Sequence, residues 1–211
     1  MRILIVGASQ GTGAEAVKIA LERGHEVTAF ARTPSKLAIE HPKLTKIAGD
    51  FHNRESIESA VRGHHAVIIT AMSSSLKGFK ENPTYFSQGT ACTIEAMKVH
   101  GVRRLVVLSA WGVGESRKLA NFLVDKLMIS FLLKAPYEDH ERQEKRVRES
   151  GLDWVIARPT RLTNGPAQRR YVKKTGLEPV PSSISRADTA DFLVTAAEVD
   201  IWIHQAVQLG G

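Results

Sequence analysis

The sequence predicts a single α/β domain with a doubly wound, mostly parallel sheet, and two of its features support this prediction. Short apolar runs alternate with longer segments of helical periodicity along all 211 residues. Alternation of this kind is typical of strand–helix–strand units joined by right-handed crossovers. Several runs, such as residues 67–69 and 105–108, are unbroken and rich in β-branched side chains. Such runs fit strands that are covered on both faces, as in a parallel sheet.

The expected elements follow each other in regular order. Strands are expected at residues 3–6, 26–30, 44–48, 66–70, 104–108, 154–157 and 206–209. Helices are expected at residues 14–23, 54–62, 84–100, 138–150 and 185–197. The first four helices are each followed by glycine, and Ser185 with Asp188 resembles a capping box opening the last. No repeat or linker interrupts residues 1–211, and segments around 111–137 and 159–185 are expected to form a small substrate-pocket part.

Charge and composition limit the classes of partner. The formal net charge is +7, and a basic surface attracts polyanions. The basic residues are dispersed, however, and alternate with acids between residues 138 and 149, without interleaved aromatic side chains. Nucleic-acid binding is therefore not expected.

Membrane and metal binding are not expected either. No apolar run reaches the length of a membrane span. The single cysteine, Cys92, excludes an internal disulfide and argues against a thiolate metal site. With no secretory signal recognised at the N-terminus, we expect a cytoplasmic protein with a small-molecule partner and no metal. The oligomeric state is left open.

A glycine-rich turn after the first strand predicts a dinucleotide site. Gly7 permits a tight exit from the strand, Gly11 leaves room for a pyrophosphate, and Gly13 allows the helix to pack closely. The helix N-terminus offers free N–H groups and a positive dipole end to the phosphates. The residues between these glycines, Ser9, Gln10 and Thr12, are expected to line the same site.

The end of the second strand predicts which dinucleotide is preferred. NAD sites carry an acidic residue here for the ribose hydroxyls. This chain instead has Arg32, followed by Thr33, Ser35 and Lys36. Arg32 is expected to face a 2′-phosphate, and a charge-assisted hydrogen bond of about 1.5–3 kcal/mol favours NADP(H) over NAD(H) roughly ten- to a hundredfold. The alternative is a solvent-exposed arginine with no ligand.

Two further strand ends contribute expected cofactor residues. After the third strand, Asp50 either accepts from the adenine amine with Phe51 packed nearby, or forms a plain turn. At the end of the fourth strand, Thr70, Ala71 and Met72 are expected beside the adenosine and pyrophosphate.

Several segments in this order resemble a known superfamily. They are the glycine loop and residues 27–32, 48–50, 96–102, 106–110, 139–145, 149–154, 158–160 and 185–188. Together they resemble the short-chain dehydrogenase/reductase superfamily, over nearly the whole chain. The closer resemblance is to its atypical NAD(P)-binding branch, which includes NmrA-like proteins and the flavin reductase also called biliverdin IXβ reductase.

Departures from this family pattern limit the chemistry. The glycine spacing at positions 7, 11 and 13 matches the tyrosine-dependent dehydrogenases better than the atypical branch. Their Tyr-x-x-x-Lys pair is nevertheless missing, since Tyr137 is followed four residues later by Glu141. By register, His140 takes the place of the lysine, and Arg161 replaces a histidine of the flavin reductase. Alcohol–ketone chemistry through a tyrosinate is therefore not expected.

The resemblance implies an active site at the mouth of the fifth strand. Ser109 is the expected active-site serine, donating to a carbonyl or flavin edge or holding a water, unless it is only a turn serine. Tyr137 and His140 are candidate proton donors at the nicotinamide end, or solvated helix residues. The remaining residues expected to border this end are Ala110, Trp111, Pro159 and Thr160.

The sequence therefore favours an NADPH-dependent oxidoreductase that reduces a flavin, quinone or similar conjugated acceptor. The expected acceptor pocket is lined by Trp111, Phe122, Leu123, Leu127, Phe131 and Arg161. The stretch from 122 to 131 is alternatively a dimer surface or ordinary core. Two other functions remain open: a non-catalytic NADP(H)-sensing regulator of NmrA-like type, and an NAD-dependent epimerase or dehydratase.

Overall fold

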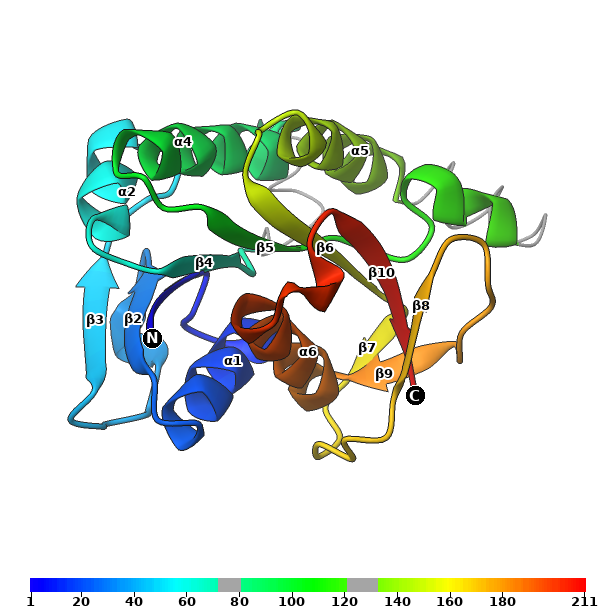
Figure 1. Cartoon of the computed structure of the whole chain (residues 1–211), viewed down its shortest axis with the longest axis horizontal. Coiled ribbons are helices and arrows are strands. Elements are labelled where there is room, and N and C mark those ends of the chain that lie inside the picture. The colour runs from blue at the N-terminus through cyan, green and yellow to red at the C-terminus, as the bar shows by residue number, and fades with distance from the viewer. Residues whose placement is uncertain (72–80, 121–132) are drawn as a thin grey trace.

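The computed structural model describes residues 1–71, 81–120 and 133–211, and one large sheet runs through the molecule (Figure 1). Its eight strands lie in the order β3-β2-β1-β4-β5-β6-β10-β8. Their bounds are β1 (Arg2–Val6), β2 (Glu26–Ala31), β3 (Leu44–Ala48), β4 (Ala66–Ile69), β5 (Arg104–Leu108), β6 (Asp153–Pro159), β8 (Val172–Thr175) and β10 (Gln205–Gly210). Every neighbouring pair is parallel except β10 with β8. The strand order reverses direction between β1 and β4, which confirms the predicted doubly wound Rossmann architecture.

Helices cover both faces of this sheet (Figure 1). On one face lie α1 (Gly11–Glu22) and α6 (Arg186–Glu198), which pack on each other. On the other face lie α2 (Arg54–Val61), α4 (Tyr85–Val99) and α5 (Lys134–Arg148). Short 3₁₀ turns occur at η1 (Pro34–Lys36), η2 (Gly114–Leu119) and η4 (Asp200–Trp202).

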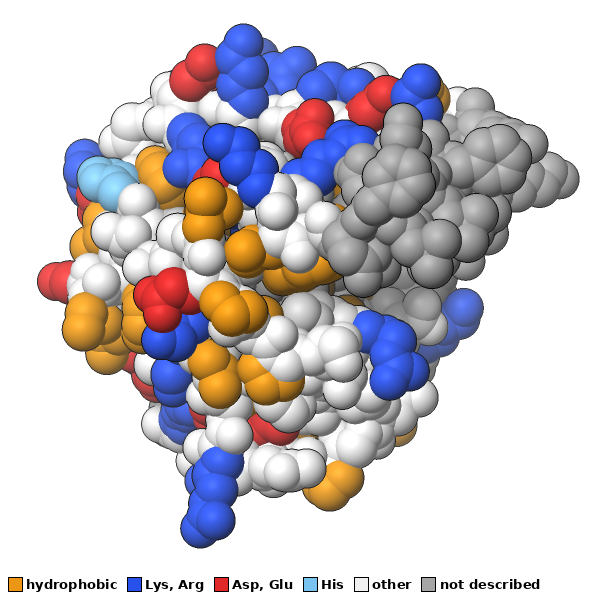
Figure 2. Space-filling model, turned by 90° about the vertical axis from the view of Figure 1, so that its right-hand side faces the viewer, with side chains coloured by type: hydrophobic (Ala, Val, Ile, Leu, Met, Phe, Trp, Pro, Cys, Tyr) orange, Lys and Arg blue, Asp and Glu red, His pale blue; other side chains and the backbone are white. Residues whose placement is uncertain are grey.

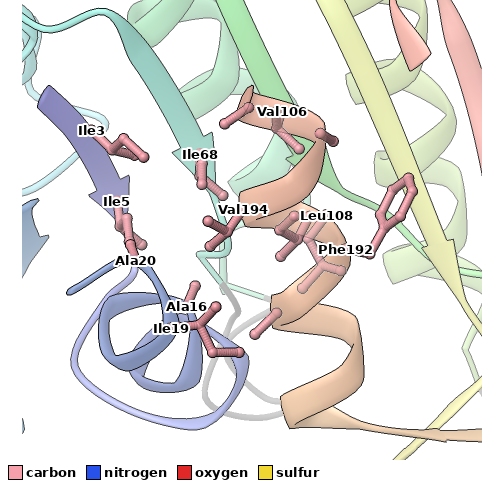
Figure 3. Close-up of a cluster of buried hydrophobic side chains, with 14 of the residues drawn as sticks. Ile3, Ile5, Ala16, Ile19, Ala20, Ile68, Val106, Leu108, Phe192 and Val194 are labelled. Carbon is pink, nitrogen blue, oxygen red and sulfur yellow. The ribbon is translucent and has the colours of Figure 1, made fainter. Parts of the chain in front are cut away.

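The double cover explains why the strand sequences are unbroken apolar runs. In β1, Ile3 and Ile5 pack into the cluster under α1 and α6, while Leu4 and Val6 belong to the cluster under α2, α4 and α5. Figure 3 shows the first cluster, where side chains of α1 and α6 pack on the strand side chains that point toward these two helices. Full burial of one such side chain contributes about 1.5–3 kcal/mol.

The structure differs from the sequence predictions mainly at short elements. Two of them, β7 (Arg161–Thr163) and β9 (Ser183–Ser185), form a separate two-stranded sheet, and β8 extends the main sheet. These strands were not predicted because runs of three or four mostly polar residues carry no clear period. Helix α5 begins at Lys134, a turn before the predicted start, and α1 begins within the glycine loop.

The predicted cap of the last helix is confirmed. The Ser185 hydroxyl accepts a hydrogen bond of 2.9 Å from the backbone N–H of Asp188. Helix α6 therefore has a defined first turn, which begins at Arg186.

On the face shown in Figure 2, lysine and arginine side chains are scattered among acidic and neutral ones rather than gathered in one band. Within the described ranges, no helix has both the length and the apolar character needed to cross a membrane.

Candidate functional site

A cavity of about 760 Å³ opens beside the glycine loop, at the carboxyl ends of β1, β2, β3 and β4. Most residues predicted to bind the cofactor line it: Gly7, Ser9, Gln10, Gly11, Thr12, Arg32, Thr33, Lys36, Asp50, Phe51, Thr70 and Ala71. The cavity is also lined by residues that were not predicted: Val6, Phe30, Ala31, Gly49, Tyr85, Leu162 and Arg186. The topology thus brings four strand ends to one site, as expected for an open α/β sheet.

Close backbone packing forms the floor of the cavity. A Cβ atom at Gly13 would lie 2.3 Å from the Gly7 carbonyl oxygen and 2.6 Å from the Thr70 hydroxyl. Gly13 therefore lies behind the cavity and lets α1 start directly on the strand ends. The Thr70 hydroxyl donates to the Val6 carbonyl at 2.9 Å and so ties β4 to the end of β1.

The start of α1 is open to an anion. Gly11 opens the helix with a φ of 56°, and the Gln10 side chain makes no capping hydrogen bond. No acidic residue lies in the first turn. The N–H groups of that turn and the positive end of the helix dipole are therefore available at the cavity, which fits a pyrophosphate.

Positive charge surrounds the end of β2. Arg32 and Lys36 are exposed and line the cavity. Within the described part of the chain, neither forms an ion pair with a carboxylate. Burial tends to raise the pKa of Asp50, but hydrogen bonds from His52 and the charges of His52 and Arg32 together lower it. Asp50 is therefore an ionised neighbour of Arg32, and this wall carries two cations and one anion.

Asp50 belongs to a turn, and both Asp50 and Phe51 line the cavity. The Asp50 carboxylate accepts from the backbone N–H of His52 at 3.0 Å and from its ring Nδ1 at 2.8 Å, as in a plain turn, yet it also lines the cavity. The Phe51 ring is buried against α4, where a Cβ at Gly89 would lie 2.1 Å from it. Tyr85 stands next to Phe51, with ring centroids 5.2 Å apart, and adds an aromatic wall that no sequence motif indicated.

The Ser109 hydroxyl forms a hydrogen bond to the carboxylate of a buried ion pair. Its hydroxyl lies 2.7 Å from a Glu144 oxygen, and Arg158 donates to the same carboxylate at 2.8 and 2.5 Å. The Ser109 hydroxyl donates its single proton to this carboxylate. Donation from Ser109 to a carbonyl or a flavin edge stays a prediction that requires the hydroxyl to leave Glu144, while its lone pairs can accept from a water in the present arrangement.

Tyr137 and His140 are also engaged within the protein. The Tyr137 hydroxyl donates to the Trp111 carbonyl at 3.0 Å, and burial raises its pKa. The His140 ring stacks on Phe86 of α4 with centroids 4.0 Å apart, and its Nδ1 contacts the Gln143 side chain at 2.9 Å. Burial lowers the pKa of His140, so the ring is neutral at pH 7.

This geometry corrects two interpretations of α5. His140 is buried rather than solvated, since it is only 5 % exposed and packs between α5 and α4. The α5 residue that reaches Ser109 is Glu144, one turn beyond His140. The three candidate catalytic side chains, Ser109, Tyr137 and His140, therefore form separate contacts and share no hydrogen bond among the described residues.

The other residues expected at the nicotinamide end do not line the cavity. The Thr160 hydroxyl donates to the Pro181 carbonyl at 2.9 Å and contacts the Leu209 carbonyl at 3.2 Å. Ala110, Trp111 and Pro159 lie next to these contacts at the ends of β5 and β6. Met72 and the predicted pocket residues Phe122, Leu123, Leu127 and Phe131 lie outside the described residues.

Comparison with known sequences identifies the family of the chain. A family model described as NAD(P)H-binding matches residues 7–200. The chain is 40% identical over 113 residues to a 3-beta-hydroxysteroid dehydrogenase of Mycolicibacterium neoaurum, a match covering 50% of this chain but 31% of that protein. The chain thus spans less than a third of that relative. It is 25% identical to the uncharacterized sugar epimerase YhfK of Bacillus subtilis, over 94% of this chain and 88% of that protein.

Solved structures share the fold over the full length. A short-chain dehydrogenase/reductase of Veillonella parvula in complex with NADP superposes with a TM-score of 0.83 at 21% identity, covering 100% of this chain and 94% of that one. ChuY of Escherichia coli O157:H7, described as an anaerobillin reductase, gives a TM-score of 0.82 at 20% identity, covering 100% and 97%. With the glycine loop, the strand order and the family match in agreement, this chain belongs to the NAD(P)H-binding family of Rossmann-fold proteins.

Proposed function

We propose that this protein is an NADPH-dependent reductase of a conjugated acceptor such as a flavin or a quinone. The observation that carries the proposal is the cavity itself, where a free helix N-terminus and the cations Arg32 and Lys36 face one space. In this arrangement the glycine loop holds the pyrophosphate and the end of β2 holds the 2′-phosphate. The adenine lies near Tyr85 and Phe51.

The residues near the end of β5 fit an acceptor that needs little acid–base help. When bound, the reduced nicotinamide supplies a hydride, which electron-poor flavins and quinones accept directly. The side chains of Ser109, Tyr137 and His140 are held in protein contacts. Their part in such a reaction is to keep the strand ends and the 109–111 loop in place, so that the acceptor can stack on the cofactor. The name of the E. coli structural neighbour adds linear tetrapyrroles to the acceptors worth testing.

The cofactor preference is tested by calorimetric titration of the purified protein with NADPH and NADH. We expect about ten- to a hundredfold tighter binding of NADPH, lost in Arg32→Gln, because that substitution removes a charge-assisted contact to the 2′-phosphate. Arg62→Gln is the matched control, since Arg62 lies near the amino ends of the strands, away from the cavity. Equal affinity of the wild type for NADPH and NADH would contradict the predicted preference. The negative charge of Asp50 beside Arg32 works against binding of a 2′-phosphate and therefore against this preference.

The acceptor class is tested by NADPH oxidation with riboflavin, FMN, a soluble quinone and biliverdin. Turnover well above the uncatalysed rate with at least one of these acceptors is expected. Tight NADPH binding without any turnover would contradict the reductase.

That outcome would favour a second function, a non-catalytic NADP(H)-sensing regulator. The observation favouring it is that the hydroxyls of Ser109 and Tyr137 and the Nδ1 of His140 each contact a protein partner. A sensor predicts tight cofactor binding and a protein partner whose association depends on NADPH. An epimerase or dehydratase, suggested by the name of the B. subtilis relative, instead needs a proton-transferring residue. An epimerase or dehydratase would keep NAD bound to the protein and would not oxidise NADPH.

A further inference from the structure

Arg186 lies against the glycine loop although it is far from it in the sequence. It is the first residue of α6, and its side chain lines the same cavity as the loop. A Cβ atom built on Gly11 would lie 3.6 Å from the Arg186 Nε and 3.7 Å from its Cδ. The guanidinium group is therefore placed beside the N-terminus of α1, where the pyrophosphate of a dinucleotide is expected.

The small sheet outside the main one determines this position. Strand β7 pairs in parallel with β9, with Thr163 opposite Ser185. The next residues along the two strands are Asn164 and Arg186, and an Arg186 NH1 donates to the Asn164 Oδ1 at 2.7 Å. The pairing of β7 with β9 thus places the arginine at the cavity, next to the glycine loop.

The charge of Arg186 is left uncompensated by nearby carboxylates. Asp188, in the same helical turn, accepts from the backbone N–H groups of residues 168 and 169 and from Ser185. Asp191, a turn later, binds Arg23 and Tyr171. Within the ranges 1–71, 81–120 and 133–211, no carboxylate forms an ion pair with Arg186. One of its N–H donors is used by Asn164, and an arginine has five.

We propose that Arg186 binds the cofactor pyrophosphate from beside the N-terminus of α1. This inference rests on the proposed dinucleotide binding and adds to it a residue of the small sheet. Arginine suits this role because its planar fork makes paired hydrogen bonds to phosphate oxygens. Arg32 and Arg186 then have separate tasks. Arg32 reads the 2′-phosphate, which only NADP(H) has, while Arg186 binds the pyrophosphate shared by NADH and NADPH.

The division of tasks gives a test that measures binding rather than turnover. Titration calorimetry is carried out with NADPH, NADH and ADP-ribose, which carries the pyrophosphate without a 2′-phosphate or nicotinamide. Arg186→Gln is expected to weaken all three by about tenfold or more, leaving the ratio of NADPH to NADH affinity unchanged. Arg32→Gln is expected to change that ratio and to leave ADP-ribose binding as it was.

Thermal unfolding of each variant separates lost binding from lost folding. If Arg186→Gln does not fold, Arg186→Lys and Asn164→Ala replace it. Both variants retain the positive charge at position 186. Each is expected to weaken the binding of NADPH, NADH and ADP-ribose by the same factor, which is smaller than the factor for Arg186→Gln.

Three outcomes would overturn the inference. Wild-type affinity of folded Arg186→Gln for ADP-ribose would remove Arg186 from the pyrophosphate. A loss confined to NADPH would assign Arg186 to the 2′-phosphate instead. Failure of the wild type to bind any of the three ligands would overturn the proposed function as well, and so is distinguishable from the first two.

Discussion

The polar side chains differ between the two halves of the sheet: those of one half face a cavity, and those of the other half bond to each other. Around β1, β2 and the start of α1, the cations Arg32, Lys36 and Arg186 and the first-turn N–H groups face a cavity. Around β5, β6 and α5, the polar side chains satisfy each other, as Ser109, Glu144 and Arg158 do. A ligand site keeps its donors open, whereas a structural network closes them. The first half therefore has the character of a binding site and the second that of a scaffold for the site.

The strongest test of the scaffold is the buried ion pair between Glu144 and Arg158, whose side chains are 4% and 1% exposed. Glu144→Ala leaves the arginine charge buried, with the half-exposed Glu115 as its one remaining carboxylate partner among the described residues. We expect a loss of about 3–5 kcal/mol in the free energy of unfolding, measured by urea denaturation.

The double variant Glu144→Leu with Arg158→Met is the control, because it removes both charges together. It is expected to be far less destabilised than the single variant. A loss below about 1 kcal/mol in Glu144→Ala would mean that Glu115 alone compensates the arginine, and the contrast between the two halves would weaken.

The floor of the binding half is tested at Gly13. An alanine there would press its Cβ onto the Gly7 carbonyl, so α1 must move away from the strand ends. We expect a destabilisation of about 2–3 kcal/mol and a loss of NADPH affinity. Gly165→Ala is the matched control, because the nearest atom to its added Cβ lies 4.0 Å away and its effect should stay within about 0.5 kcal/mol. Equal effects at the two positions would show that close packing at the loop is not required.

The smallest expected effect is a dependence of stability on pH at His140. Burial lowers its pKa in the folded protein, while the unfolded chain has a value of about 6.5. Between these two values the unfolded state binds more protons, so stability is complete above about pH 6.5 and decreases as the pH falls. The slope is at most about 1.4 kcal/mol per pH unit.

His140→Gln removes this titration, so the unfolding free energy of the variant should vary less between pH 7 and 5 than that of the wild type. His64, whose pKa is also lowered by burial, is retained in both proteins and cancels in the comparison. Parallel pH profiles would contradict the buried, neutral state of His140 and reopen its role as a proton donor.

The sequence pattern predicted the features that depend on neighbouring residues in the chain, namely the buried strands and the glycine loop. The apolar runs of β1, β4 and β5 were recognisable because strands covered on both faces need apolar side chains at every position. The glycine loop was recognisable because a strand, a tight turn and a helix must follow each other directly. Arg32 and Thr70 were predicted at the cofactor site because they stand at the ends of predicted strands.

Only the tertiary structure decided which distant side chains meet. Arg186 reaches the glycine loop through the pairing of β7 with β9, and strands of three residues leave no periodic signal in the sequence. On α5, the sequence resemblance placed His140 near the active-site serine, but the packing against α4 turned it away and brought Glu144 there. His140 and Glu144 lie about one helical turn apart, with directions that differ by roughly 40° and positions about 6 Å apart along the axis, so the placement of α5 on the sheet decides which of them reaches Ser109. Sequence therefore determined the fold and the cofactor loop, while three-dimensional packing decided which polar groups remain free to bind.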